Sequence, residues 1–381
     1  MAIAAVSATW TLGGAVESAA AESAAAGFVD PLDSAANFLP APEQGAFLGL
    51  GSTGQRLVGV GLRGLAVVSE DGGGHWRQAA VPVQSDLTAV RFVTAEVGWA
   101  AGHDGVILTT ADAGAHWSKV LDGRMSQRAF EEYYAEKIAH GQEELQPYLE
   151  QIQMNFQAGP SLPYLDICFD TPSFGLAVGP FGMIAATEDG GKTWKPWLEH
   201  VDNPDFLGFN AIRRIGGEIY MAGERGTVFR FDRAAQKFSA FPTGYRGGLF
   251  GIVGNDRGDL VAFGLQGTLV RGEDGGRRWT RLASPVTTTI TGGTLLPDGG
   301  PDGALGGAFM LVTIAGQVLV SRDGGLSFRL SSGGGVPGAS DATVAGAAHV
   351  VIASLAGLAV KPVADLLRAG TALGKDAGND H

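Results

Sequence analysis

The stretch Thr187-Glu188-Asp189-Gly190-Gly191-Lys192-Thr193-Trp194 decides the fold, because variants of it recur along the chain. Asp-Gly after a β-rich run is a strong hairpin signal, and glycine supplies the positive φ that a tight turn needs. The aspartate side chain can accept backbone N–H bonds inside the turn, and the aromatic residue starts the next strand and buries a large apolar area. The pattern S/T-x-D-x-G-x-x-W therefore predicts a β-hairpin whose aspartate acts as a turn staple, which means that its side chain accepts hydrogen bonds from the backbone N–H groups of the turn.

Five other segments carry this pattern, known as the Asp-box or BNR repeat. Residues 69–76, 110–117 and 272–279 are full copies, 321–328 ends in Phe, and 230–238 is a degraded copy with one extra residue. The turn and packing positions that we assign to the boxes are Asp71, Trp76, Asp112, Trp117, Asp189, Trp194, Asp274, Trp279, Asp323 and Phe328. Regular repetition of one hairpin is typical of a β-propeller.

A second marker, Gly-x-x-Gly or a variant that keeps the last glycine, lies between two β-runs. The last glycines are Gly64, Gly105, Gly182, Gly226, Gly267, Gly316 and Gly357, with successive spacings of 41, 77, 44, 41, 49 and 41 residues. A period near 41 is the length of one four-stranded propeller blade. The seven markers predict an all-β, seven-bladed β-propeller over residues 27–363.

The spacing of 77 residues indicates an insertion between blades 2 and 3. Residues 124–160 contain no box and no alternating strands, so they do not form an eighth blade. Their apolar residues recur at intervals of three and four, which is helical periodicity. We expect one or two amphipathic helices there, broken near Gly141 or Pro147.

The two ends of the chain lie outside the repeats. Residues 1–26 are rich in alanine and resemble a secretory leader without its positive start, since the first basic residue is Arg56. They predict an exported or periplasmic protein. An N-terminal strand within residues 28–50 is expected to complete blade 7, and residues 364–381 form a C-terminal tail.

Composition excludes several functional classes. The net charge is −12 with no basic cluster, which argues against nucleic acid or an anionic membrane as the partner. Cys168 is the single cysteine, so no intrachain disulfide forms, and its apolar surroundings indicate a buried core residue. No apolar run of about 20 residues predicts an integral membrane span, and no cofactor or metal motif is present.

Strands a to d of each blade run from the axis outward, so the boxes form the c–d hairpins of one face. The Gly-x-x-Gly turns are then b–c turns on the opposite face, together with the insertion. Loops carry function in such scaffolds. The partner-binding face predicted from these positions consists of Arg63, His103, Asp104, Phe181, Glu224, Arg225, Gln266, Tyr133, Tyr134 and Tyr148.

Enzymes of the sialidase and xyloglucanase type also use Asp-box blades. The Arg-Ile-Pro signature of sialidases is absent, because Arg214-Ile215 is followed by Gly216. The available carboxylates are not paired by any spacing typical of glycosidases; they are Asp86, Asp104, Asp166 and Glu224. We expect a non-catalytic binding or assembly protein, and a glycoside hydrolase or carbohydrate-binding propeller is the alternative.

Two parts of the chain resemble the photosystem II stability/assembly-factor propellers. One is residues 177–182 together with Thr187–Trp194, and the other is residues 97–105. The resemblance covers residues 45–363 and implies a non-catalytic chaperone or scaffold for membrane-protein assembly. The insertion and the run 163–167 resemble a bacterial subgroup of exported proteins carried beside RND-type exporters. That resemblance implies a membrane protein complex or another envelope protein as the partner.

Overall fold

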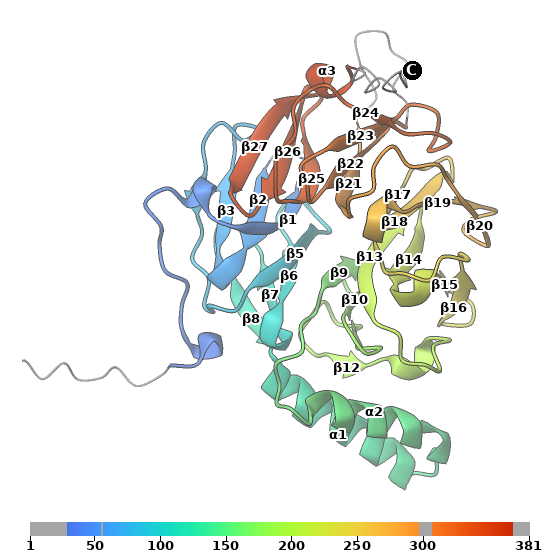
Figure 1. Ribbon diagram of the computed structural model, residues 1–381. Coiled ribbons are helices and arrows are strands. Elements are labelled where there is room, and N and C mark those ends of the chain that lie inside the picture. The colour runs from blue at the N-terminus through green and yellow to red at the C-terminus, as the bar shows by residue number, and fades with distance from the viewer. Residues whose placement is uncertain (1–28, 55, 297–306, 369–381) are drawn as a thin grey trace, which may run out of the picture.

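The computed structural model describes residues 29–54, 56–296 and 307–368, and it forms a ring of seven sheets (Figure 1). Six sheets have four strands in sequential order, and the seventh has three. The predicted seven-bladed propeller is therefore confirmed. The expected leader, residues 1–26, and most of the expected tail lie outside the described residues.

Each blade begins at the axis and meanders outward. The innermost strands are β1 (Phe47–Ser52), β5 (Leu87–Phe92), β9 (Asp166–Phe169), β13 (Phe209–Ile215), β17 (Leu249–Gly254), β21 (Ile290–Leu295) and β25 (Ala339–Ala345). The second strands are β2 (Leu57–Gly61), β6 (Gly98–Gly102), β10 (Gly175–Val178), β14 (Glu218–Gly223), β18 (Leu260–Gly264), β22 (Phe309–Thr313) and β26 (His349–Ser354). All pairings within the blades are antiparallel.

The outer strands of the blades are shorter in several cases. The third strands are β3 (Ala66–Ser69), β7 (Ile107–Thr110), β11 (Ile184–Thr187), β15 (Thr227–Asp232), β19 (Leu269–Glu273), β23 (Val318–Ser321) and β27 (Gly357–Pro362). The fourth strands are β4 (Arg77–Gln78), β8 (Ser118–Leu121), β12 (Lys195–Pro196), β16 (Lys237–Pro242), β20 (Arg278–Arg281) and β24 (Arg329–Leu330).

The expected N-terminal strand of blade 7 is wrong, although η2 (Pro42–Gln44) packs against β27. Residues 29–46 hold two short 3-10 helices, η1 (Pro31–Asp33) and η2, and the first strand after them is the innermost strand of blade 1. Proline at the start of each turn favours this local structure over a strand. Within the described residues, β27 is followed only by the short helix α3 (Val363–Leu366).

The ring closes through side chains of the innermost strands. In blade 7, the Ser340 hydroxyl donates to the Phe47 carbonyl at 2.9 Å, and an Asp341 carboxylate oxygen accepts from the Leu50 N–H at 3.1 Å. A similar hydrogen bond joins blades 3 and 4, where Asp166 accepts from the Ile212 N–H at 2.8 Å. These bonds join strands of neighbouring blades that are not paired as a sheet.

Four Asp-boxes have one shared geometry. In the box of blade 3, the Thr187 hydroxyl donates to Asp189 at 2.9 Å and accepts from the Gly191 N–H at 2.8 Å. Asp189 accepts from the backbone N–H groups of Lys192 and Thr193. The Trp194 indole N–H donates to the Gly191 carbonyl at 3.2 Å. The boxes of blades 1, 2 and 6 repeat the hydroxyl–aspartate bond, so the sequence interpretation of a turn staple holds there.

The box of blade 5 differs. Gly272 occupies the position of the hydroxyl residue, and Asp274 has a positive φ of 50°. Its carboxylate lies 2.9 Å from the Arg278 guanidinium, and no backbone N–H among the described residues donates to it. Trp279 keeps its indole bond to the Gly276 carbonyl at 2.9 Å. Asp274 is therefore not a turn staple, because the hydroxyl that orients the aspartate in the other boxes is missing.

The insertion forms two helices, α1 (Gly123–Ala139) and α2 (Gln146–Phe156), linked by the short 3-10 helix η5 (Glu143–Leu145). The break falls at Gly141, whose φ of 93° favours glycine. In Figure 1 the helices lie at the outer edge of the ring beside β12, and contacts join α1 to that strand. The insertion extends the propeller outward and does not roof its centre.

Replacing Asp189 by alanine removes the acceptor for two backbone N–H groups, and we expect a loss of about 1 kcal/mol in unfolding free energy. Burial alone would raise the pKa of this carboxyl, but hydrogen bonds from Thr193 and Thr187 lower it from 3.8 to about 2. The contribution is therefore complete above pH 3.8 and disappears as the pH falls through about 2. Denaturant titrations across this window check the expectation, with Asp274→Ala as the control that changes little.

Asp341→Ala leaves the Leu50 N–H at the seam of blades 7 and 1 without its partner. We expect the free energy of unfolding to fall by about 1–3 kcal/mol, because a hydrogen bond to a charged acceptor is lost. Ser340→Ala should cost less, about 1 kcal/mol, since a neutral hydroxyl bond is weaker. Equal stability of Asp341→Ala and the unmodified chain in denaturant unfolding would contradict this account of closure.

Candidate binding face

Most b–c turns are pinned, which here means that a backbone hydrogen bond ties the turn to the start of its own blade. In six blades the N–H of the second turn residue donates to the carbonyl just before the innermost strand, at 2.8 to 3.2 Å. The pairs are Leu62 with Ala46, His103 with Asp86, Glu224 with Gly208, Leu265 with Gly248, Ile314 with Thr289, and Leu355 with Gly338. Blade 3 has Pro180 at this position, which has no N–H. The pins gather the turns on one face.

The third residue of five turns has a left-handed backbone. Its φ is between 49° and 57°, a conformation that side chains other than glycine rarely adopt. These residues are Arg63, Asp104, Phe181, Arg225 and Gln266, all assigned to the face from the sequence. The glycine that follows permits the tight turn. Because the turn recurs, it presents five different side chains at equivalent positions.

The polar side chains of the face have separate partners. Asp104 accepts from the Ser85 hydroxyl at 2.6 Å, and Glu224 accepts from the Gly208 N–H at 2.9 Å. The Arg225 guanidinium lies 2.6 Å from Asp205 in an exposed ion pair. The Arg63 side chain makes no ion pair with the described part of the chain. The face therefore contains scattered charges rather than one converging site.

Three tyrosines of α1 and α2 attach the insertion to blade 3. Tyr134 is fully buried, donates to Glu199 at 2.5 Å and accepts from the Leu198 N–H at 3.2 Å. Tyr133 reaches the other Glu199 oxygen at 3.4 Å, and Tyr148 packs edge-on against Phe206. Burial, followed by the Glu199 charge, raises the pKa of Tyr133 to about 12 and also raises that of Tyr134. Tyr134 thus belongs to this packing and is not on the accessible surface.

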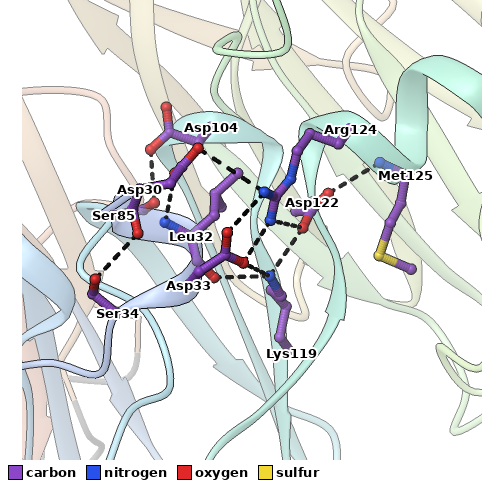
Figure 2. A network of polar contacts seen from close by, with 10 residues as sticks. All are labelled: Asp30, Leu32, Asp33, Ser34, Ser85, Asp104, Lys119, Asp122, Arg124 and Met125. Carbon is purple, nitrogen blue, oxygen red and sulfur yellow. Dashed lines mark hydrogen bonds and ion pairs between the residues drawn. The ribbon is translucent and has the colours of Figure 1, made fainter. Parts of the chain in front are cut away.

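An ion-pair network fixes the start of the insertion (Figure 2). Asp122 caps α1 by accepting from the Met125 N–H at 3.0 Å, and it also binds Lys119 at 2.9 Å. Arg124 forms two bonds to Asp33 of the N-terminal segment, at 2.9 and 2.8 Å. Burial alone would raise the pKa of Asp122, but these donors hold it below its usual value. The network joins the N-terminal segment, blade 2 and α1.

The central channel contains charged residues that the sequence did not identify as a site. A polar cavity of about 150 Å³ is lined by the innermost strands, with Arg91 and Arg213 on either side of Asp166. Burial and the neighbouring Arg91 lower the pKa of Arg213 to about 9. The one available signal was that Asp166 and Asp341 stand where other innermost strands have glycine or alanine. Both carboxylates accept backbone N–H bonds from the next blade.

The four carboxylates considered for glycosidase chemistry have different hydrogen-bond partners. Asp86 accepts from the Arg63 N–H at 2.7 Å, whereas Asp166 lies in the channel beside its arginines. Asp104 and Glu224 have the separate partners described above. Among the described residues, no group of His, Cys, Asp and Glu side chains is arranged to hold a metal ion. The arrangement fits binding better than acid–base catalysis.

Comparisons with known proteins agree with this architecture. The family model described as "Photosynthesis system II assembly factor YCF48" matches residues 142–246. "Photosystem II assembly lipoprotein Ycf48" of Synechococcus sp. (strain CC9902) is 23% identical over 289 residues, covering 71% of this chain and 70% of that protein.

Two solved structures of the same group are similar in fold. One, described as "YCF48 bound to D1 peptide", has a TM-score of 0.60 and 17% identity, covering 87% of this chain and 99% of that one. YCF48 from Cyanidioschyzon merolae has a TM-score of 0.58 and 16% identity, covering 86% and 98%. The WD40 propeller domain of Doa1 matches with a TM-score of 0.58 at 9% identity, covering 87% and 95%.

The repeats, the blade count and the turn face define a BNR-type β-propeller. Within that class, the chain is similar to the photosystem II assembly-factor propellers, in agreement with the resemblance in its sequence. The family model and the Synechococcus relative are both named for photosystem II assembly. None of the helices in the described ranges is long and apolar enough to cross a membrane.

Tyr134→Phe removes the buried hydroxyl that joins α1 to Glu199 and Leu198. We expect a loss of about 1–3 kcal/mol in local stability, because the partly buried Glu199 carboxylate loses its short bond and the Leu198 N–H loses its acceptor. Hydrogen exchange of residues 123–156 should become faster while the blades stay protected. Tyr133→Phe is the matched control, since its hydroxyl bond is long and half-exposed, and identical exchange in the two variants would refute the assignment.

Proposed function

We propose that this chain is a non-catalytic assembly propeller that binds an exposed segment of a membrane-protein complex through its b–c face. The main support is the set of pinned turns, which presents different side chains at equivalent positions around one rigid ring. The described structural relative holds a D1 peptide, and such a peptide is the kind of partner that a rigid loop face can bind. The four carboxylates, each engaged by a different partner, give no comparable support to hydrolysis.

The cell envelope is the proposed location. The Synechococcus relative is named a lipoprotein, and the alanine-rich residues 1–26 resemble an export leader. The finer version of the proposal makes the partner a component of an RND-type exporter, on the basis of the insertion and the run 163–167 that resemble the exported bacterial subgroup. In this version the insertion widens the contact surface beside blade 3.

Site-specific photo-crosslinking in host membranes tests the proposal. A photoreactive side chain at Phe181, which is 56% exposed on the b–c face, should crosslink to a subunit of an integral membrane complex. The matched control is Leu326 of the blade 6 Asp-box, which is 59% exposed on the opposite face and should give no such product. Crosslinks from Leu326 alone, or cleavage of chromogenic glycosides by the unmodified chain, would contradict the proposal.

A further inference from the structure

Four consecutive blades present apolar side chains at the pinned second position of the b–c turn. Going around the ring through blades 5, 6, 7 and 1, these residues are Leu265, Ile314, Leu355 and Leu62. They are 38%, 44%, 52% and 37% exposed. We call these four residues the apolar arc. Blades 2 and 4 instead have His103 and Glu224 at this position.

The arc is continuous across the boundary between blades 6 and 7. The Gly338 N–H donates to the Ile314 carbonyl at 2.9 Å, and the Leu355 N–H donates to the Gly338 carbonyl at 3.2 Å. A chain of two hydrogen bonds therefore joins neighbouring turn tips. The Leu355 bond is also the one that pins the blade 7 turn, and the other three tips are pinned to their own blades by separate bonds, so the arc is a preformed surface rather than a set of independent loops.

The turns and connections that carry the arc contain no charged residue over three blades. On this face, the b–c turns of blades 5, 6 and 7 comprise residues 265–267, 314–317 and 355–357, and the connections to the next blades comprise 282–289 and 331–338. None of these segments contains Asp, Glu, Lys, Arg or His. The chain as a whole is 17% charged. The face thus has an uncharged half over blades 5 to 7, which is bordered by Glu43 of η2 beside β27 and by Arg63 next to Leu62. At its other border, Arg281 stacks over Tyr245, whose hydroxyl donates to the Leu265 carbonyl.

We propose that the apolar arc binds an uncharged, apolar segment of a partner protein. A charged side chain placed against the uncharged half would lose water without gaining an ion partner, and that desolvation is unfavourable. An apolar side chain gains from burial against the four exposed residues, at about 25 cal/mol per Å² removed from water. Four turn tips form a narrow surface, which suits a short segment better than a folded domain.

This inference rests on the proposed function and names the part of the face that recognises the partner. The charged half would then contact polar flanks of the same partner and contribute orientation rather than most of the burial. An anionic bilayer is a poorer occupant, because the chain carries a net charge of −12 and would be repelled from it.

A random-peptide phage library selected on the full chain tests the assignment. The enriched peptides should be apolar and free of charge, and the most enriched one, made synthetically, serves as the probe for affinity measurements. Ile314→Glu should weaken its binding about tenfold or more, as expected for a central contact. Leu326→Glu places the same charge on an equally apolar, exposed residue of the same blade on the opposite face, and it should change affinity less than about twofold.

Leu355→Glu provides a second variant on the arc, and thermal unfolding verifies that each variant is folded. Charged enriched peptides, or equal affinities for Ile314→Glu and Leu326→Glu, would overturn the inference. Binding to phosphatidylcholine vesicles that Ile314→Glu weakens would also overturn it, because the arc would then bind lipid. Self-association that Ile314→Glu weakens would do the same, because the arc would then bind a second copy of the chain. The two proposals can fail separately. If Ile314→Glu leaves peptide binding unchanged but Phe181 still crosslinks to a membrane complex, the assignment of the apolar arc fails and the proposed function stands.

Discussion

The propeller depends on hydrogen bonds between innermost strands that do not belong to the same sheet. Antiparallel pairing builds each blade, but it does nothing to hold one blade beside the next. Asp341 and Asp166 use their carboxylates to bind backbone N–H groups across two blade boundaries. The hydroxyls of Thr88 and Thr291 donate to backbone carbonyls across two further boundaries, and that of Ser340 does so across the same boundary as Asp341. Directional bonds at the axis therefore fix the relative positions of blades whose outer parts pack through apolar side chains.

The number of blades was readable from the sequence because a hairpin signal and a turn signal recur with one period. The absence of an N-terminal strand from blade 7 was not readable, because it depends on the local geometry of two short 3-10 helices that begin at Pro31 and Pro42. Asp274 shows a similar limit: its box has the aspartate and tryptophan, but Gly272 removes the hydroxyl that orients the carboxylate. A repeat motif thus predicts the hairpin more reliably than the role of each residue in it.

The candidate site was predictable where it follows from turn topology and unpredictable where it depends on packing between distant segments. The turn tips lie on one face because every b–c turn must do so. Tyr134 was assigned to that surface from helical spacing alone, whereas Glu199 of blade 3 buries it. Arg91 and Arg213 come from strands of blades 2 and 4, and they meet beside Asp166 only when blades 2, 3 and 4 pack side by side.

Pro180 changes how the b–c turn of blade 3 is held. Its turn lacks the N–H that pins the others inward, and the Phe181 carbonyl instead lies 3.4 Å from the amide groups of Gln151 and Asn155 on α2. Phe206, beside the same turn, touches Tyr148 of that helix. The helical pair contacts the turns of blades 2 and 3, because α1 also packs against the blade 2 turn at residues 103–105. Of these two turns, only that of blade 3 lacks the backbone bond to the start of its own blade, so Phe181 is the point of the b–c face most closely tied to the insertion.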